Sequence, residues 1–571
     1  MFFFSSIFDL VGVVSILPFL SVLTEPEIIN ENIFLIKLNS YLNLEVEEFV
    51  IFLGLVSFIL VILNQCLRLF SRVCSTAYCR NLIFKNSREL FNFYLNKPYN
   101  FFLSQNNAHL IQKCTNYVEA VISGFVSPFL FISSNFFTTI FILSFLFYYQ
   151  PIITLGLIIL LPIFYFSIYK KLSKKIDKIG QSYPKYFSMS SAAIGDAFGS
   201  IKQLKLTKNS FFFVNKFSDA AKKYRNSNIL LNLFIGLPSI SIEILAYGIL
   251  LFVSLFLFLN FDNFSQFIPI VGVLAISLKR VMPSAQDIYA QILQIKFHNA
   301  SFSKIINDFE NSFLLSNKRA LRNSKDKKIQ FDKEVNFKKI EFSYDSSKNI
   351  LSVNGKIKQG QFIGICGKSG HGKTTFLDIF CGLLSPTSGK IMIDGIPFNK
   401  QYIESWQKKI GYAPQSGYIL NDTIQNNIAL GSAELKHFKK IQKICKVVEI
   451  SRFIETRLSK KYNSKLGEGG IGMSGGQQQR LIIARALYHD PQLIILDEAT
   501  NALDNITERK ILKNIRKYFP KATILFVTHR VKSLKRCDNI LLFDKGKVIA
   551  EGTYSFLNRK SKVFRNMNIK N

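Results

Sequence analysis

Long apolar runs in the first half of the chain limit its possible folds more than any other feature. Six runs lie before residue 285, at about 2–24, 49–70, 121–149, 151–169, 229–259 and 264–281. A helix needs about 20 apolar residues to cross the roughly 30 Å hydrocarbon core of a bilayer. We therefore predict six membrane spans. The first run has no basic leading region, so we interpret it as a span and not as a cleaved signal.

The charges in the connecting loops predict the orientation of these spans. The loop after the first run contains Lys37 and six glutamates, whereas the loops after the second and fourth runs are rich in lysine and arginine. Lysine and arginine are retained on the cytoplasmic side of short membrane loops. We therefore expect a multi-pass protein of the cytoplasmic (inner) membrane, with both termini and the C-terminal half of the chain in the cytoplasm.

The two basic loops are long, and phenylalanine, leucine and tyrosine recur along them. Disordered segments are poor in such residues. We interpret the loops as membrane helices that continue into the cytoplasm, with disordered basic loops as the alternative.

The formal net charge of +34 raises the question of nucleic-acid binding. Lysine, asparagine, isoleucine and phenylalanine are abundant together, which is typical of an AT-rich genome, and no basic helix with interleaved aromatic residues stands out. We attribute the charge to composition and to residues that face the membrane surface, and we expect no nucleic-acid partner.

The chain length requires more than one domain. Hydrophobic cores stop growing at roughly 250 to 300 residues, and this chain has 571. From about residue 335, short apolar strands alternate with helical segments, which is typical of an α/β domain. A polar, charged stretch separates the two patterns. We predict a transmembrane domain at 1–310, a linker at 311–333 and an α/β domain at 334–571.

A glycine-rich loop in the α/β domain predicts its ligand. An apolar strand pattern ends at Cys366, the loop follows, and a helical stretch begins at Phe376. This is the P-loop (Walker A) pattern G-x-x-x-x-G-K-[ST], in which backbone amides and a helix N-terminus hold phosphates. Lys373 is expected to contact the β and γ phosphates, and Thr374 a Mg²⁺ ion. The residues expected to bind ATP are Gly367, Lys368, Ser369, Gly370, His371, Gly372, Lys373, Thr374 and Thr375.

Two carboxylates end a second apolar strand, at 493–498. Unpaired charge at a buried strand tip is costly, so the carboxylates need a partner. Mg²⁺ is the expected partner of Asp497. Glu498 would polarise the water that attacks the phosphate. The alternative is a pair of solvated acids at the start of a loop.

The segment 473–480, Met-Ser-Gly-Gly-Gln-Gln-Gln-Arg, resembles the LSGGQ signature of ATP-binding-cassette (ABC) proteins. The resemblance implies that Ser474, Gly475, Gly476 and Gln477 face the γ-phosphate bound by the opposite subunit. Met473 in place of leucine is a mild departure from the family pattern.

The same resemblance assigns roles to further single residues. It implies that Gln415 bridges Mg²⁺ and the membrane domain, that Asp504 belongs to the D-loop, that His529 is the switch histidine and that Tyr344 stacks on adenine. Asn501 in place of serine is a second mild departure. The catalytic set implied is therefore Glu498, His529 and Gln415, and the metal-binding set is Thr374, Gln415 and Asp497.

Six spans followed by one cassette resemble an exporter half-transporter. The fold implied is an all-α six-helix transmembrane domain followed by an α/β P-loop domain with a helical subdomain. The resemblance also implies an active ATPase, a homodimer with two shared ATP sites, and coupling helices near 97–106 and 195–205. A heterodimer with a second half-transporter remains open.

The membrane part resembles, more patchily, bacterial lipid-linked-oligosaccharide flippases. The resemblance rests on Pro18-Phe19, on Leu237-Pro238 with Glu243, and on the segment 280–285. It implies an amphipathic, lipid-linked substrate. Unlike those flippases, this sequence starts almost inside the first span.

Two arginines, Arg68 and Arg280, lie near the cytoplasmic ends of spans two and six. They would either bind an anionic substrate head or snorkel to the interface. Two alternative functions stay open: export of a lipid A-like lipid, peptide or drug, and a non-pumping cassette regulator or channel.

Overall fold

The computed structural model divides the chain into two compact units. The helical unit comprises Met1–Lys97 and Ser104–Arg322, and the sheet unit comprises Pro98–Leu103 and Asn323–Asn571. The residues that the structure describes are 2–260, 264–321, 327–344, 350–430, 437–467, 470 and 472–569.

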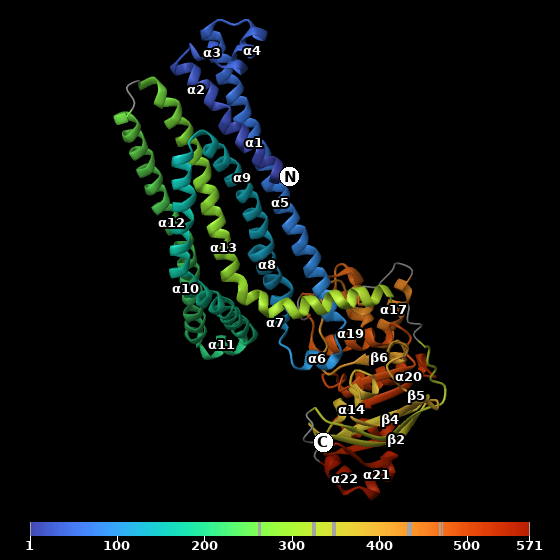
Figure 1. Cartoon of the computed structure of the whole chain (residues 1–571). Helices are drawn as coiled ribbons and strands as arrows, with labels where there is room; N and C mark the ends of the chain where they lie inside the picture. Colours follow the sequence, from blue (N-terminus) through green and yellow to red (C-terminus); the bar gives the residue numbers. More distant parts are fainter. Residues whose placement is uncertain are drawn as a thin grey trace. The chain divides into compact units, whose positions relative to one another are not determined.

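The helical unit is built from long helices that lie side by side (Figure 1). Two π-helical turns, Lys113–Tyr117 and Ile122–Val126, interrupt the segment that leads into α9. The α-helices of this unit are α1 (Phe2–Val14), α2 (Ile16–Thr24), α3 (Ile28–Glu31), α4 (Ile33–Leu42), α5 (Val46–Leu95), α7 (Asn107–Gln112), α8 (Val118–Val121), α9 (Ser127–Tyr149), α10 (Pro151–Gly199), α11 (Ile201–Thr207), α12 (Ser210–Asn260) and α13 (Phe264–Leu321).

Local sequence signals explain where several of these helices begin. A capping box between Glu45 and Glu48 starts α5. Pro151 occupies the first turn of α10, where its missing N–H costs nothing, and Gln150 alone separates this helix from α9. The turn between these two helices is therefore very short.

Five helical segments in the described part of the chain are long and apolar enough to cross a membrane. They are Phe2–Thr24, Val46–Leu95, Asn107–Tyr149, Pro151–Gly199 and Ser210–Leu255. They contain the first four predicted spans and residues 229–255 of the fifth. The sixth predicted span, 264–281, lies in α13, and the side chains of its first seven residues fall outside the described part. This span stays a prediction.

Four helices are much longer than a bilayer crossing requires. α5, α10, α12 and α13 contain 50, 49, 51 and 58 residues, against the roughly 20 needed to span the hydrocarbon core. They therefore continue well beyond it. Because α13 ends at Leu321, residues 311–321 of the predicted linker are helical.

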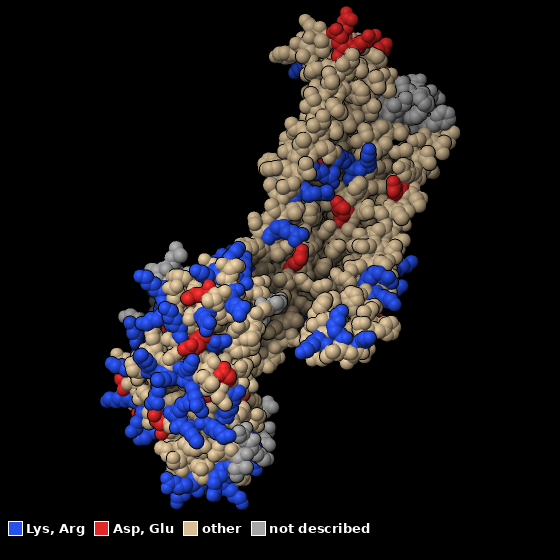
Figure 2. Space-filling view, turned by 180° about the vertical axis from the view of Figure 1, so that it is seen from behind, with Lys and Arg blue, Asp and Glu red and all other residues tan. Residues whose placement is uncertain are grey.

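Charge is unevenly distributed along the helical unit. On the face shown in Figure 2, acidic residues gather at the end that carries α3 and α4, where α5 begins with Glu47 and Glu48. Lysines and arginines gather at the opposite end, beside α11, and a further group of basic and acidic residues lies midway along this face. The rest of the surface between the two ends is largely uncharged, as the surface of a membrane-spanning region is.

The sheet unit is an α/β domain whose described residues form ten strands in the order β5-β4-β1-β2-β10-β9-β3-β8-β7-β6. β9, β3, β8, β7 and β6 are parallel to one another, and β1, β2, β4 and β5 form an antiparallel part. The strands are β1 (Glu334–Phe342), β2 (Leu351–Lys358), β3 (Phe362–Gly367), β4 (Ser388–Ile393), β5 (Ile396–Pro397), β6 (Ile410–Ala413), β7 (Leu493–Asp497), β8 (Thr523–Val527), β9 (Asn539–Asp544) and β10 (Lys547–Gly552).

Helices cover the parallel strands of the sheet unit (Figure 1). β3, β7 and β8 are buried along their whole length, as parallel strands usually are. The α-helices of the sheet unit are α6 (Tyr99–Leu103), α14 (Lys373–Phe380), α15 (Ile403–Gln407), α16 (Ile424–Ala429), α17 (Phe438–Val447), α18 (Ser451–Arg457), α19 (Gly475–Leu487), α20 (Asn505–Tyr518), α21 (Tyr554–Lys560) and α22 (Lys562–Ile569). The predicted fold class, a helical domain followed by an α/β P-loop domain, is confirmed.

Candidate nucleotide-binding site

The glycine-rich loop connects β3 to α14, as the sequence predicts. Gly370 and Gly372 have φ angles of 77° and 87°, a left-handed region that favours glycine. The Lys373 ammonium donates to the carbonyl oxygens of Gly367 and Lys368 at 2.9 and 3.0 Å. Its burial lowers the pKa of Lys373, and the charges of the carboxylates at the end of β7 oppose this shift. The lysine is therefore held at the loop in position to meet an anion.

His371 has a different environment from the other loop residues. Its Nδ1 lies 3.2 Å from the backbone nitrogen of Lys545 and 3.0 Å from Oδ1 of Asp544. Its side chain thus faces the β9–β10 turn. We infer that this residue contributes to the loop through its backbone.

Asp497 ends β7 and is 6% exposed. The Tyr412 hydroxyl, from the neighbouring strand β6, donates to its Oδ2 at 2.9 Å. Burial raises the pKa of Asp497. Burial, with the charge of Asp497, also raises the pKa of Asp378 on α14 to about 6. The site therefore contains buried carboxylates whose ionised forms a cation would stabilise.

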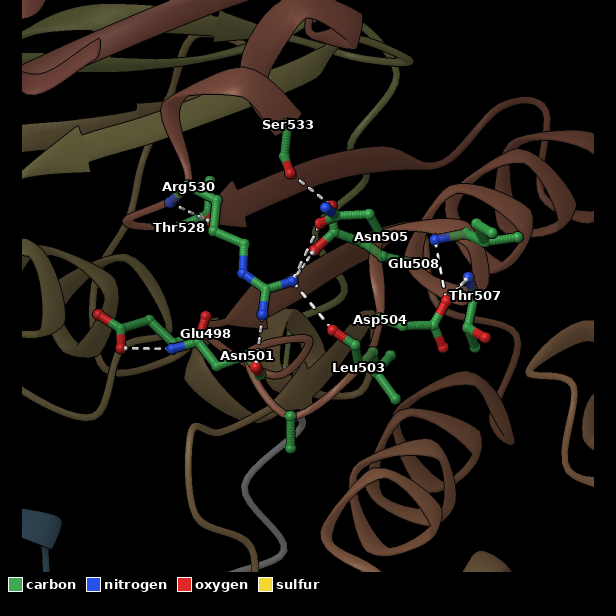
Figure 3. Close-up of polar contacts among 12 residues, drawn as sticks. Glu498, Asn501, Leu503, Asp504, Asn505, Thr507, Glu508, Thr528, Arg530 and Ser533 are labelled. Atoms are coloured by element: carbon green, nitrogen blue, oxygen red, sulfur yellow. Dashed lines mark hydrogen bonds and ion pairs between the residues drawn. The ribbon is translucent and has the colours of Figure 1, made fainter. Parts of the chain in front are cut away.

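Glu498 follows directly and is held by one residue from a distant segment and one from the turn that follows it. His529 Nε2, just after β8, contacts its Oε1, and Asn501 Nδ2 donates to its Oε2 at 3.0 Å. Figure 3 shows the contact between Glu498 and Asn501. Both carboxylate oxygens are engaged, so the orientation of the side chain is fixed.

Arg530 holds the turn that follows Glu498 (Figure 3). Its guanidinium donates to the carbonyl oxygens of Leu503 and Asn501 at 2.9 and 2.8 Å. Asp504 in the same turn caps α20 by accepting from the backbone of Ile506 and Thr507 at 3.0 and 2.9 Å. Hydrogen bonds from Thr507 lower the pKa of Asp504.

Ser474 is the N-cap of α19. Its hydroxyl accepts from the Gln477 backbone at 3.3 Å, and the Gln477 side chain accepts from the Ser474 backbone at 2.9 Å. A Cβ on Gly476 would lie 3.2 Å from the carbonyl oxygen of Ala502, so α19 starts close to the 499–504 turn. The backbone amides in the first turn of a helix have no partner within the helix and can bind an anion.

The structure brings only part of the predicted set together. Lys373, Asp497, Glu498 and His529 lie close enough for their charges to interact. Among the described residues, no hydrogen bond or ion pair joins 474–477 to the loop 367–375. Gln415 lies exposed beyond β6. Tyr344 is 53% exposed and has its ring 4.9 Å from that of Phe342.

Tyr412, Arg530 and Asn501 were not predicted as site residues. Each lies close in sequence to a predicted site residue, but only the fold shows which atoms they contact. The residues present nevertheless fit a magnesium nucleotide. A glycine-lined loop, a buried lysine, an exposed Thr374 and the buried Asp497 form an oxygen-rich set, which is what Mg²⁺ prefers.

The short helix α6 clusters with the sheet unit, although it follows α5 in the chain. Burial raises the pKa of Tyr99, and the charges of Asp378 and Tyr344 act on it. α6 therefore lies beside the nucleotide site, and it falls in the predicted coupling segment at 97–106.

The predicted substrate arginines lie in the helical unit. Arg280 is on α13, with its Nη1 3.6 Å from Oδ1 of Asp9. The charge of Arg68, on α5, acts on Arg280 and on Asp287. Asp9, on α1, was missed because a single acid in an apolar run gives no sign of its partner.

Two family models match the chain. The ABC transporter transmembrane region matches residues 5–274, and the ABC transporter model matches 350–501. The heterocyst differentiation ATP-binding protein HepA of Nostoc is 31% identical over 50% of this chain and 47% of its own length. The ATP-dependent lipid A-core flippase of Wigglesworthia glossinidia brevipalpis is 27% identical over 84% of this chain and 81% of its own.

The chain spans about half the length of the first curated relatives it matches, 49% and 47% in two of them. A bacterial Atm1-family ABC exporter with ATP bound is similar in structure along the whole chain. The TM-score is 0.77 at 20% sequence identity, with 99% of this chain and 97% of the exporter covered. The chain therefore has the fold of ABC exporters, with a segment that matches the ABC transporter transmembrane region followed by one that matches the ABC transporter model.

Proposed function

We propose that this protein is a homodimeric, ATP-driven exporter that moves an amphipathic substrate across the cytoplasmic membrane by alternating access. The observation that carries the proposal is the engagement of Glu498 by His529 and Asn501, next to the glycine-rich loop. A non-pumping regulator has no need of a carboxylate oriented in this way. Lys373, Asp497, Glu498 and His529 together favour a working ATPase.

The positions of the predicted residues support nucleotide binding. Tyr344 is exposed and can stack on adenine, and the backbone of 367–375 with Lys373 receives the phosphates. Thr374, Asp497 and Gln415 are the residues that would hold Mg²⁺, which when bound neutralises charge on the phosphates. Tyr412 orients Asp497 for this role through its hydroxyl.

Hydrolysis requires a base that is oriented toward the attacking water. His529 and Asn501 engage the two oxygens of Glu498 and leave the carboxylate little freedom to rotate. Glu498 then positions the water and accepts its proton. Arg530 keeps the following turn in place and so preserves the position of Asn501.

The homodimer supplies the second half of each site. The amide groups at the start of α19, with Ser474, Gly475, Gly476 and Gln477, have no hydrogen bond to the loop of their own chain among the described residues. We assign them to the γ-phosphate held by a second copy. Asp504 lies in the turn that this arrangement places at the subunit boundary.

Closure of the sheet units is transmitted to the membrane helices. α6 and Gln415 are the assigned connections, and the support for α6 is the proximity of Tyr99 to Asp378 and Tyr344. The helical unit has an acidic end and a basic end, and basic residues are retained on the cytoplasmic side. This supports the proposal that both termini and the sheet unit lie in the cytoplasm.

The substrate proposed is a lipid-linked oligosaccharide or similar glycolipid whose anionic head meets Arg68 and Arg280. A lipid A-like lipid is the second candidate, supported by the Wigglesworthia flippase, which aligns with 84% of this chain. Peptides and drugs are weaker candidates. An arginine whose side chain extends to the membrane interface would have no role in substrate binding.

The Glu498→Gln variant tests the proposed function. In proteoliposomes the variant should bind ATP as tightly as wild type and lose ATPase activity by about 100-fold or more, because it lacks the base. The control is Glu404→Gln, which alters an exposed acid paired with Lys408 and should keep full activity. Unchanged hydrolysis in Glu498→Gln would refute the assigned role.

A flipping assay tests the substrate. Wild-type proteoliposomes receive a fluorescent lipid-linked oligosaccharide or a lipid A analogue, with Glu498→Gln as the inactive reference. ATP-dependent transfer of the first supports the primary proposal. Transfer of the second alone would replace it.

A further inference from the structure

A buried acid lies in the first helix of the membrane region. Asp9 is 3% exposed and lies in α1, an otherwise apolar helix of a segment long enough to cross a membrane. An ionisable side chain in such a helix is costly, faces the protein interior and is by default a functional candidate. Its surroundings indicate what it does.

Neutral donors from two other helices hold the Asp9 carboxylate. The Asn64 amide, on α5, donates to Oδ1 at 2.9 Å, and the Thr138 hydroxyl, on α9, donates to Oδ2 at 3.4 Å. Ser6 lies 3.0 Å from the same hydroxyl. The position of the carboxylate therefore does not depend on a cation.

Arg280 approaches this carboxylate without a hydrogen bond to it. Its Nη1 lies 3.6 Å from Oδ1, whereas charge-assisted hydrogen bonds measure about 2.7 to 2.9 Å. The Arg280 side chain is 18% exposed and that of Asp9 4%. The nearby carboxylate of Asp9 neutralises the charge of the guanidinium. Because the guanidinium has five N–H donors, it keeps donors for another anion.

The cluster also contains a buried polar atom without a partner. Oδ1 of Asn64, a residue 1% exposed, accepts no hydrogen bond in the described part of the chain. Buried polar groups are normally satisfied. This orphan acceptor distinguishes the cluster from a finished structural ion pair.

Lys113 and Asp308 form such a finished pair in the same unit. Lys113 Nζ donates to Asp308 Oδ2 at 2.6 Å, and the Tyr94 hydroxyl donates to the same oxygen at 2.8 Å. This pair is joined by a short hydrogen bond, in contrast to the pair of Asp9 and Arg280.

We propose that Asp9 is a displaceable counter-ion for Arg280. It neutralises the guanidinium when the site is empty and competes with the substrate anion for it when the site fills. The inference rests on the proposed function, in which Arg280 meets an anionic head. Because Asp9 is held by neutral donors, its carboxylate stays in place after displacement and resets the pair.

The competition makes Asp9 a specificity-determining residue. A monoanion offers Arg280 little more than Asp9 already does. A phosphate monoester or diphosphate brings more charge and can bind two guanidinium donors at once. The ligand class selected is therefore a phosphoryl anion, either as the head of a lipid or as a soluble phosphate.

The first arm of the test uses full-length protein in phosphatidylcholine vesicles with increasing phosphatidic acid, and it measures ATPase stimulation. The half-stimulating fraction is the fraction of phosphatidic acid in the vesicles that gives half of the maximal ATPase stimulation. Asp9→Asn should lower it by at least about fivefold, which is the lower end of typical coupling between competing interactions. Arg280→Gln, alone or with Asp9→Asn, should lose the stimulation by phosphatidic acid. The matched control Asp308→Asn should leave the half-stimulating fraction unchanged.

The second arm uses detergent-solubilised protein and inorganic phosphate. Removing the counter-ion leaves Arg280 free for phosphate, so the Tm of Asp9→Asn should rise more with phosphate than that of wild type and Asp308→Asn, in which phosphate can bind the glycine-rich loop alone. If phosphate raises the Tm of Asp9→Asn in this way but phosphatidic acid has no effect, the site binds soluble phosphates. Asp9 would still be the counter-ion of Arg280. A Tm and a half-stimulating fraction that both match wild type would overturn the proposal.

Thr138→Val keeps the proposal testable if Asp9→Asn does not fold. Loss of one neutral donor lets Asp9 turn toward Arg280, so the half-stimulating fraction should rise, opposite to Asp9→Asn. An unchanged fraction contradicts the proposal. Absence of ATPase activity in wild type would contradict the proposed function instead, and the phosphate arm would still test Asp9.

Discussion

At the scale of single residues, Glu498 has a backbone conformation that side-chain-bearing residues seldom adopt. Its φ angle is +51°, a region that costs such a residue of order 1 kcal/mol or more. The hydrogen bond from its backbone nitrogen to the Val527 carbonyl at 3.1 Å helps to hold this conformation. The sharp turn sends Glu498 toward His529 while Asp497 stays against Tyr412. Neighbouring acids thereby take different roles.

Asn501→Ala tests whether the second contact to Glu498 matters. Loss of a hydrogen bond to a charged group should lower kcat for ATP about tenfold and leave KM for ATP unchanged, because only the orientation of the base is affected. Steady-state ATPase assays measure both constants. Asn539→Ala is the control, since Asn539 bonds Glu551 at the start of β9, at the opposite end of the strands from the glycine-rich loop. Equal kcat in Asn501→Ala and wild type would show that His529 alone orients the base.

His298 predicts how stability changes with pH. Burial lowers its pKa to about 4 from the ordinary value of 6.5. Between pH 6.5 and 4 the unfolded chain binds a proton that the folded chain does not, so stability falls as pH falls through this window and is constant above it. The loss should be about 1 to 3 kcal/mol for this half-buried group.

The measurement for His298 is the Tm of the solubilised protein from pH 7.5 to 4.5. His298→Asn should flatten the profile in this window, because asparagine does not titrate. Replacing the exposed His437 with asparagine should leave the profile as in wild type. Parallel curves for His298→Asn and wild type would rule out the assignment.

At the scale of elements, α10 and α13 approach so closely that only glycine fits between them at one point. A Cβ on Gly180 would lie 2.2 Å from the backbone oxygen of Phe297. Backbone cannot move aside as a side chain can, so the two helices would have to separate. The same helix contains Gly156, which has no atom within 4 Å of its Cβ position.

Gly180→Ala should therefore destabilise the protein by about 1 to 3 kcal/mol, the usual cost of overpacking. Gly156→Ala is the matched control and should be neutral or stabilising, because alanine favours a helix over glycine by about 1 kcal/mol. Thermal unfolding of full-length protein in detergent compares them. Equal Tm values for the two variants would mean that α10 and α13 are not in tight contact.

The sequence predicts elements whose signals are local. Apolar runs of about 20 residues predict five of the long helices, and the strand-loop-helix pattern at 361–384 predicts the P-loop, since each signal lies within one stretch of chain. Tyr412 was missed because its partner Asp497 is 85 residues away and meets it only when β6 pairs with β7. Asp9 and Asn64 likewise meet only after helices assemble.

At the scale of the whole molecule, the proposed ATP site is incomplete in a single chain. The glycine-rich loop with Glu498 forms one half, and the start of α19 forms the other. Among the described residues these two halves share no hydrogen bond or ion pair. Two copies that face each other would complete both sites at once, which is why the dimer is part of the proposed mechanism and not an addition to it.

Cross-linking between two different variants tests this arrangement. Protomers with Ser369→Cys are mixed with protomers with Ser474→Cys, both also carrying Glu498→Gln to retain ATP. Both positions are exposed, and Cys366, Cys381, Cys445 and Cys537 of the sheet unit are buried and should not react.

A short thiol cross-linker should join the two variants when ATP is present, because closure brings residue 369 of one copy to residue 474 of the other. Ser388→Cys, exposed on β4, replaces Ser474→Cys as the control and should give no product. Equal yields with and without ATP would mean that the nucleotide does not bring the two copies together, and export by alternating access would then lack its driving step.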